Sequence, residues 1–318
     1  MDSGKHMNEK CMNGQRTYWH LSDLGRKPED YDIATTRLLY YPARGFEVRT
    51  PIAQWYERYQ QGCPLQLDDW DSFRDPRATT YTAYTQGQKE KDAFVSQLLH
   101  ATDLPRHDQS LPSVWVERLE DILAPLRYPV HALQMVAAYL GSMAPGGRLV
   151  VTFMLQSADE IRRVQWLAQR MRQLQHSYPD FGVDSKAVWQ EAPHWQPLRR
   201  LIEQLLITYD WGEAFVALNL VLKPAFDDLF CAQLARHAAA SNDTMLEKLL
   251  GSLQEDCRWH ALWSQEFLRV LNAHGARNQD FIKTVMERWQ DRLSGVLEPL
   301  AERMTTPLLC TSDYAGNH

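Results

Sequence analysis

Long helical patterns follow one another from residue 90 to residue 304 and decide what this chain can fold into. Residues 130–143 are almost all apolar, which is typical of a helix buried on every side. Between residues 113 and 126, the apolar side chains that share one face at 3–4 spacing are Trp115, Leu119, Ile122 and Leu123. Further helices are predicted at residues 92–101, 149–176, 198–222, 227–240, 244–274 and 281–304. The sequence therefore predicts an all-α fold, a bundle of long helices over residues 89–304.

The charge balance and the cysteines narrow the class of protein. The 318 residues carry a formal net charge of −6, whereas nucleic-acid binding needs a basic face. No apolar run reaches the roughly 18–20 residues of a membrane span, and we expect no secretory leader in residues 1–15. The five cysteines are far apart and form no C-x-x-C pair. A cytoplasmic protein with free thiols is expected, rather than a disulfide framework or a zinc site.

An irregular, aromatic segment precedes the helices. Residues 17–88 show no sustained period, and only residues 52–60 look like a short helix. Such a segment is too long for a structureless loop in a compact domain and too aromatic to be disordered. We predict an extended arm that lies either on its own bundle or on another subunit, between polar, flexible tails at residues 1–16 and 305–318. The predicted interface anchors are Trp19, Tyr40, Tyr41, Trp55, Tyr56, Tyr59, Trp70, Phe73, Tyr81 and Tyr84.

Common catalytic signatures are missing. The sequence has no G-x-S-x-G, no G-x-G-x-x-G and no P-loop, which disfavours nucleophile-elbow, dinucleotide and nucleotide enzymes. A long-helix bundle leaves a carboxylate-bridged di-iron centre, which takes a Glu from two helices and Glu-x-x-His from two others. The one literal match joins Glu191 to His194, but Pro193 and Pro197 oppose a regular helix there, and we interpret it as a loop.

Two other strings come closer to a metal-binding helix. They are DEIRR at residues 159–163 and DCRWH at residues 256–260. Each resembles the D-E-x-R-H string on the metal-binding helices of bacterial multicomponent monooxygenases. Arg163 stands where the first string needs histidine, and Cys257 stands where the second needs glutamate.

Further strings carry the resemblance along nearly the whole chain, from about residue 17 to residue 289. They are YWHL (18–21), KPEDYDI (27–33), WY (55–56), WDSFRDP (70–76), YTAY (81–84), LRY (126–128), HALQM (131–135), MAP (143–145), DWGEAF (210–215), LNLV (218–221) and NDT (242–244). On these strings the chain resembles the β subunit of the hydroxylase component of toluene, phenol and alkene monooxygenases, and it is most similar to the toluene type.

The resemblance implies a ferritin-like bundle that has lost its metal centre. The catalytic α subunit of that family resembles its β subunit in fold, so its ligand positions can be carried over. They fall on Met135, Glu160, Arg163, Lys223, Cys257 and His260. A di-iron pair needs four carboxylates to balance its charge, and Lys223 and Arg163 oppose it. We therefore expect no catalytic residue and no metal in this chain.

Glu160 and His260 are then expected to belong to a buried, hydrogen-bonded network. The sequence predicts that Glu160 pairs with Lys223 or Arg163, because a buried carboxylate without a partner is costly. A solvated face holding Arg162 and Arg163 is the alternative.

The resemblance also implies partners. The chain would be a non-catalytic, structural β subunit beside a catalytic α subunit, which holds the di-iron centre, and a small γ subunit in an (αβγ)2 hydroxylase. An effector protein, a ferredoxin and a reductase would act on the complex, which would oxidise aromatic or alkene hydrocarbons with O2 and NADH-derived electrons. Two alternatives stay open, namely a stand-alone di-iron oxidase with diverged ligands and a helical module that binds a small apolar ligand.

Overall fold

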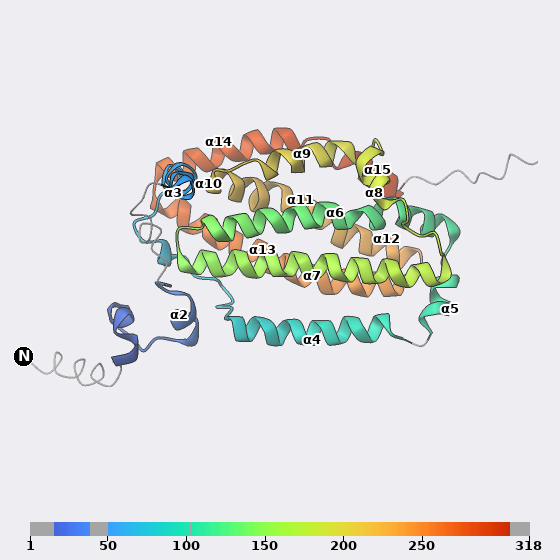
Figure 1. Ribbon diagram of the computed structural model, residues 1–318, viewed down its shortest axis with the longest axis horizontal. Coiled ribbons are helices and arrows are strands. Elements are labelled where there is room, and N and C mark those ends of the chain that lie inside the picture. The colour runs from blue at the N-terminus through green and yellow to red at the C-terminus, as the bar shows by residue number, and fades with distance from the viewer. Residues whose placement is uncertain (1–15, 39–49, 102, 306–318) are drawn as a thin grey trace, which may run out of the picture.

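The computed structural model describes residues 16–38, 50–101 and 103–305, and every regular element within these ranges is helical. Helices α6 (Ser113–Met143) and α7 (Gly147–Ser177) pack against each other, and α13 (Thr244–His274) lies against α7 (Figure 1). The fourth part of the core is a run of consecutive segments: α10 (Trp211–Phe215), η4 (Val216–Leu222), α11 (Lys223–Asp227), η5 (Asp228–Gln233) and α12 (Leu234–Ala240). The predicted all-α bundle of long helices is confirmed.

Prolines interrupt these helices less than the sequence suggests. The predicted helices at 113–126 and 130–143 join in α6, which continues through Pro125 and Pro129. Pro224, expected to kink or end its helix, lies in the first turn of α11 between the π-helical segments η4 and η5. Proline has no backbone N–H to donate. The i→i+5 hydrogen bonds of a π-turn change which backbone groups pair, so that the missing donor is not needed. Buried apolar side chains lie within two residues of each proline, and their packing offsets the local cost.

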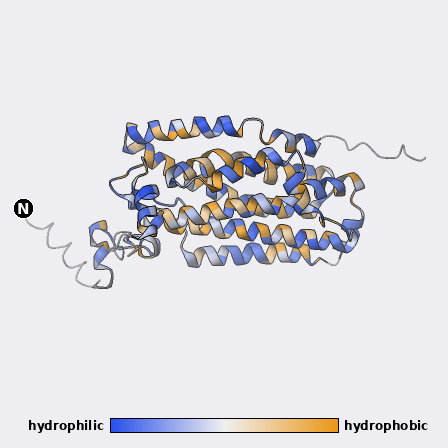
Figure 2. Ribbon diagram, turned by 45° about the horizontal axis from the view of Figure 1, so that its top comes forward, coloured by the Kyte–Doolittle hydropathy of each residue, from blue (hydrophilic) through white to orange (hydrophobic). Residues whose placement is uncertain are grey.

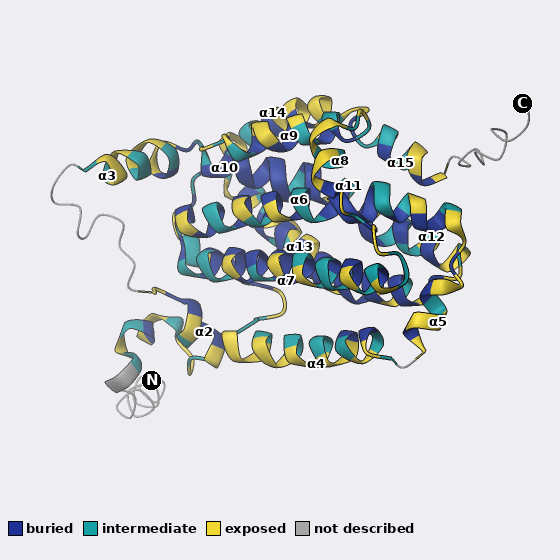
Figure 3. Ribbon diagram, turned by 45° about the vertical axis from the view of Figure 1, so that its right-hand side comes forward, coloured by how far each residue is buried: buried dark blue, intermediate teal, exposed yellow. Residues whose placement is uncertain are grey.

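Shorter helices cover this core. They are α4 (Tyr81–Leu99), α5 (Leu104–Gln109), α8 (Ser185–Glu191), α9 (Gln196–Leu206), α14 (Ala276–Leu293) and α15 (Glu298–Thr305). Apolar residues concentrate in the central helices (Figure 2), and exposed residues lie on the outer faces of α4 and α14 (Figure 3). None of the described helices combines the length and the apolar character that crossing a lipid bilayer requires.

Two predicted helices are divided in the structure. The stretch 198–222 breaks after α9, because Asp210 accepts a hydrogen bond from the Glu213 N–H at 2.9 Å and starts a new helix. The stretch 281–304 breaks at Gly295, whose φ of +70° suits glycine and ends α14 before α15 begins.

The predicted arm covers one end of the bundle (Figure 1). Its described part holds only short helices: η1 (Arg16–Leu24), α2 (Asp30–Thr35), α3 (Pro51–Tyr56), η2 (Glu57–Gln61) and η3 (Trp70–Ser72). The short helix expected at 52–60 is confirmed. The arm ends earlier than residue 88, because the Thr80 side chain caps α4 and residues 81–88 are its first turns. Tyr40, Tyr41 and most of both predicted tails lie outside the described residues.

Close approaches fasten the arm to the turn between α6 and α7. A Cβ added to Gly147 would lie 2.5 Å from the Thr35 carbonyl oxygen, so this position leaves no room for a side chain. The buried Asp32 carboxylate accepts hydrogen bonds from Arg74 and Arg148, each at 3.1 Å. Gly146 and Gly147, which contact Trp70 and Thr35, therefore leave room for the arm at this turn.

Most described aromatic residues of the arm pack on the chain's own bundle. Phe73 is fully buried against the rings of Trp263 and Phe267. Its prediction as a partner anchor is wrong, because a fully buried ring has no surface left for another chain. Trp70 packs edge-on against Trp211, with ring centroids 5.3 Å apart.

The other anchors keep more surface. Trp55, Tyr56, Tyr59 and Tyr84 are partly buried against the same core. Trp19 and Tyr81 are 75% and 72% exposed. Among the described anchors, these two have the most surface available for a partner.

A buried charged cluster as the candidate functional site

Most of the predicted ligand positions meet in the centre of the bundle. α7 contributes Glu160 and Arg163, α11 contributes Lys223, and α13 contributes Cys257 and His260. Each is at most 8% exposed. The i, i+3 spacing within α7 and within α13 places both residues of each pair on one helix face.

Met135 does not belong to this group, which corrects its predicted position. Its side chain lies on α6 and is 48% exposed. The preceding residue, Gln134, faces α7 instead and donates from Nε2 to Ser157 Oγ at 2.9 Å. One residue along a helix turns the side chain by about 100°, so a small error of register moves a position from the interior to the surface.

Two cations and two carboxylates form the centre of the site. The Lys223 ammonium donates to Glu160 and lies 2.8 Å from Asp227 Oδ2. Arg163 Nη1 lies 2.8 Å from Asp227 Oδ1 and 3.7 Å from Glu160 Oε2. The predicted pairing of Glu160 is confirmed with both cations. The alternative of a solvated arginine face is wrong, because Arg162 and Arg163 are 6% and 2% exposed.

The charges in this group support one another against burial. Burial by itself would raise the pKa of Asp227, but Lys223 and Arg163 outweigh it and hold that pKa at about 2. Burial disfavours the charged amine of Lys223, yet the carboxylates of Asp227 and Glu160 keep its pKa above the ordinary value. Lys223 and Asp227 are therefore both charged at neutral pH.

His260 belongs to an adjoining hydrogen-bond network. Its Nε2 lies 3.0 Å from Asp159 Oδ2, and Asp159 Oδ1 accepts from Tyr84 Oη at 2.8 Å and from Gln88 Nε2 at 2.6 Å. Burial raises the pKa of the Asp159 carboxyl, although its bond with His260 acts in the opposite direction. The expected buried network around Glu160 and His260 is confirmed.

These contacts do not fit a di-iron centre. The carboxylates of Glu160 and Asp227 are already neutralised by Lys223 and Arg163. Two iron ions would place a large positive charge beside two buried cations, which Coulomb repulsion at these distances forbids.

Two thiols adjoin the charged group. The sequence indicated Cys257 as a candidate position but did not indicate Cys231. Cys231 in η5 and Cys257 in α13 have their Sγ atoms 3.9 Å apart. Asp227, Cys231 and Cys257 each offer a ligand atom within 4.8 Å of the other two. Cys231 could have been found from the i, i+4 spacing of Lys223, Asp227 and Cys231, because this spacing places all three on one helix face.

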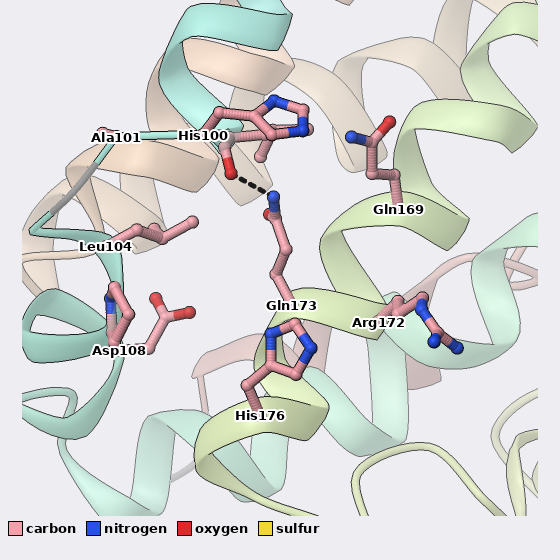
Figure 4. Close-up of a pocket in the computed structure, with 10 residues that line it drawn as sticks. His100, Ala101, Leu104, Asp108, Gln169, Arg172, Gln173 and His176 are labelled. Carbon is pink, nitrogen blue, oxygen red and sulfur yellow. Dashed lines mark hydrogen bonds between the residues drawn. The ribbon is translucent and has the colours of Figure 1, made fainter.

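A cavity of about 240 Å³ lies beside this group, and its lining includes Lys223, Asp227, Cys257 and His260. A second cavity, of about 320 Å³, lies between the α4–α5 connection and the last turns of α7 (Figure 4). There the Gln173 amide reaches across to donate to the Leu99 carbonyl. The described residues that line the second cavity form no nucleophile–base pair, and we assign it no chemistry.

The literal Glu-x-x-His match is not a ligand pair. Glu191 is the exposed last residue of α8, and His194 Nε2 lies 3.1 Å from Asp121 Oδ1 instead. The interpretation of this segment as a loop holds for residues 192–195, between α8 and α9, but not for Glu191, which is helical.

The long-helix bundle thus holds a buried charged centre on α7, α11 and α13. The family model described as Methane/Phenol/Alkene Hydroxylase matches residues 55–275, and the chain belongs to this family.

Individual relatives narrow the class. The chain is 35% identical to the β subunit of the hydroxylase component of the toluene-4-monooxygenase system of Ectopseudomonas mendocina, over 91% of this chain and 88% of that one. A chain from a solved structure of toluene 4-monooxygenase, with toluene bound in the resting active site, superposes with a TM-score of 0.85 at 32% identity, covering 92% of this chain and 98% of that chain. Phenol hydroxylase from Pseudomonas sp. OX1 shares the fold, with a TM-score of 0.82 at 20% identity over 90% of this chain and 88% of that chain. The chain is a homologue of hydroxylase β subunits, as the sequence predicted.

Proposed function

We propose that this chain is the non-catalytic, structural β subunit of a multicomponent di-iron monooxygenase hydroxylase. The assembled enzyme oxidises aromatic or alkene hydrocarbons with O2 and NADH-derived electrons. The observation that carries the proposal is the Lys223 ammonium, which lies between the carboxylates of Glu160 and Asp227. Protein cations there do what metal ions would otherwise do, because they neutralise the buried carboxylates.

Oxygen activation then belongs to another chain. In this proposal a catalytic α subunit holds the di-iron centre, and a small γ subunit completes an (αβγ)2 hydroxylase. An effector protein, a ferredoxin and a reductase act on that complex. The similarity to a toluene-4-monooxygenase β subunit over 91% of the chain supports this arrangement. The free thiols of Cys63, Cys231 and Cys257 agree with a cytoplasmic location.

The surface offers apolar contacts for partners. Trp19 and Tyr81 on the arm and α4 are largely exposed, and Met135, Met154 and Ile161 are exposed on the adjacent helices α6 and α7. Aromatic and methionine side chains are enriched in interface cores. We infer that these positions contact the α subunit.

The cavity of about 240 Å³ beside the charged group disfavours the alternative of a module that binds a small apolar ligand. Its lining includes Lys223, Asp227 and Arg258. An apolar ligand there would desolvate these charges without offering them any hydrogen bond.

Metal analysis of the separated subunits tests the proposal. The chain is co-expressed with its α and γ partners, the complex is purified, and the subunits are separated under conditions that retain iron. Iron is expected with α and absent from this chain, whether separated or expressed alone. One or two irons per copy of this chain would contradict the proposal and favour a stand-alone oxidase.

A pair of aromatic variants tests the partner surface. Trp19→Ala is expected to weaken co-purification with α, by roughly 2–4 kcal/mol if Trp19 is an interface hot spot, while the melting temperature of the isolated chain stays unchanged. Phe73→Ala is the matched control, because its ring is buried in the chain's own core and its loss lowers that melting temperature. A Trp19→Ala chain that co-purifies at full yield would remove Trp19 from the interface.

A further inference from the structure

Two cysteines that are far apart in the sequence stand at a characteristic spacing in the fold. Cys231 and Cys257 are buried, free thiols on the adjacent segments η5 and α13, and their Sγ atoms lie 3.9 Å apart. Two thiolates bound to one tetrahedral zinc ion at about 2.3 Å are about 3.8 Å apart. The two sulfur atoms of a disulfide are only about 2.05 Å apart. The pair is therefore spaced as ligands of one metal ion.

A third candidate ligand lies near the two thiols. A carboxylate oxygen of Asp227 and the sulfur atoms of Cys231 and Cys257 all lie within 4.8 Å of one another. We propose that Asp227, Cys231 and Cys257 form a site for a single thiophilic divalent ion of the Zn²⁺ type. Water from the adjoining cavity of about 240 Å³, which Asp227 and Cys257 help to line, completes the tetrahedron.

The charge balance of the cluster allows a single divalent ion bound by two thiolates, although it excludes a di-iron centre. Without metal, the cations of Lys223 and Arg163 match the carboxylates of Glu160 and Asp227. When a divalent ion binds, each cysteine loses its S–H proton to solvent and forms one metal–sulfur bond. The added charge of the ion and the two thiolates sums to zero, so the surrounding ion pairs stay balanced. A di-iron centre has no such compensation here.

The surroundings supply the second shell that thiolate sites need. Arg163 Nη1 donates to Cys257 Sγ at 3.9 Å and lies 2.8 Å from Asp227 Oδ1. A guanidinium in that place stabilises the thiolate and orients the carboxylate.

A buried nitrogen without a hydrogen bond, 3.9 Å from Glu160 Oε1, provides an independent indication of a ligand. His260 is 2% exposed, lines the same cavity, and its Nδ1 makes no hydrogen bond within the described part of the chain. With Nε2–H assigned as the donor to Asp159, Nδ1 is an acceptor. A water molecule bound to the metal in this cavity would donate to it.

The test uses the full chain in its complex with the partner subunits. The complex is treated with a chelator for weakly held ions, and Zn²⁺ and then Co²⁺ are titrated as probes. We expect one equivalent of Zn²⁺ per copy of this chain and the release of about two protons per ion. Co²⁺ is expected to give the near-ultraviolet charge-transfer band of a cobalt–thiolate site. Cys231→Ser and Cys257→Ser each abolish the band, and Asp227→Asn weakens binding.

Matched controls separate this site from incidental binding. Cys63→Ser removes a buried free thiol elsewhere, and Asp228→Asn removes the exposed carboxylate next to Asp227, so both keep the band. A thiol-alkylation assay needs no variant: Zn²⁺ is expected to protect Cys231 and Cys257, but not Cys63, from a small alkylating reagent.

Four results would each overturn the proposal, and the first three concern metal binding. These three are a wild-type complex that takes up no more Zn²⁺ than Cys257→Ser, a Co²⁺ band that survives in both serine variants, and equal alkylation with and without Zn²⁺. Disulfide formation between Cys231 and Cys257 under peroxide, without any metal uptake, also overturns it and identifies a redox pair.

Discussion

Helix α7 carries two buried ionic clusters that solve the same electrostatic problem differently. The central cluster is formed by Glu160, Arg163, Lys223 and Asp227, as described above. The terminal cluster is formed by Arg170, Asp108 and Asp243. Arg170 is 0% exposed, and its two terminal nitrogens donate to the two oxygens of Asp108 at 2.8 and 2.7 Å.

The carboxylates of the terminal cluster have further structural tasks. Asp243 caps α13 by accepting from the Leu246 N–H at 3.0 Å and also accepts from Trp115 Nε1 at 3.1 Å. The central cluster is balanced in charge but less complete in hydrogen bonds. Glu160 Oε2 and Arg163 Nε and Nη2 make none within the described residues, whereas in the terminal cluster only Arg170 Nε lacks a partner there. Asp108 lines the cavity of about 320 Å³, and Lys223 and Asp227 line the cavity of about 240 Å³, so the two clusters differ in the completeness of their hydrogen bonds and not in having a cavity beside them.

The largest effect is expected in the terminal cluster. Asp108→Ala leaves Arg170 buried without its bidentate partner, and we expect the free energy of unfolding to fall by about 3–5 kcal/mol. Urea unfolding followed by circular dichroism measures this loss. Asp291→Ala, at an exposed position of α14, is the control and is expected to change little. A loss at Asp108 as small as that at Asp291 would mean that the terminal cluster does not stabilise the fold.

The two clusters also differ in how far the sequence predicts them. In the central cluster, Glu160 and Arg163 come from the string at 159–163 and Lys223 from the ligand positions that the resemblance implies, whereas Asp227 was not predicted. Asp108 and Arg170 are 62 positions apart and belong to no motif, and only the packing of the six-residue α5 against α7 brings them together. Pairing across helices depends on rotation and register, which a single sequence does not encode locally.

The same limit explains the other differences. Helix existence was predicted from periodicity, but tertiary packing decided that α6 continues through Pro125 and that the arm gives up residues 81–88 to α4. Cys231 was passed over because its thiol partner is 26 positions away on another helix. Local patterns indicate faces of helices, and contacts between faces come from the fold.

A smaller effect is expected in the central cluster. Glu160→Gln keeps the shape of the side chain and removes its charge, but Asp227 still pairs with both Lys223 and Arg163. We expect a loss of about 2–3 kcal/mol in the free energy of unfolding, less than for Asp108→Ala. The double variant Glu160→Gln/Lys223→Gln restores the charge balance and is expected to recover part of this loss.

Turnover measurements distinguish a structural role of Glu160 from a catalytic one. In an assembled hydroxylase, Glu160→Gln is expected to leave turnover and iron content unchanged. If turnover vanished while assembly, iron content and melting temperature stayed normal, Glu160 would have a catalytic role. Glu287→Gln, on an exposed turn of α14, is the matched control.

The stability of the central cluster is expected to depend on pH in the acid range. The folded-state pKa of Asp227 is about 2, below its ordinary value of 3.8, so folding stabilises the ionised carboxylate. That contribution, roughly 2 kcal/mol, is complete above about pH 4 and is lost as the pH falls toward about 2. In chelator-treated protein, the difference in unfolding free energy between wild type and Asp227→Asn should shrink by this amount across that window. A constant difference would show that the cations do not hold the pKa of Asp227 down.

The smallest effect on stability is expected for an exposed ion pair that has the same bidentate geometry as the buried pair of Arg170 and Asp108. Arg269 holds Glu266 through two hydrogen bonds of 2.8 and 2.6 Å, nearly the distances that join Arg170 to Asp108. The Arg269 side chain is 68% exposed, however, and water and salt screen the pair. Arg269→Ala is therefore expected to leave the urea midpoint unchanged within error, at low and at high salt, while Asp108→Ala shifts it strongly. If both variants lost similar stability, bidentate geometry would be the stabilising factor in this protein. If only Asp108→Ala does, the factor is the burial that leaves Arg170 with no water to replace its lost partner.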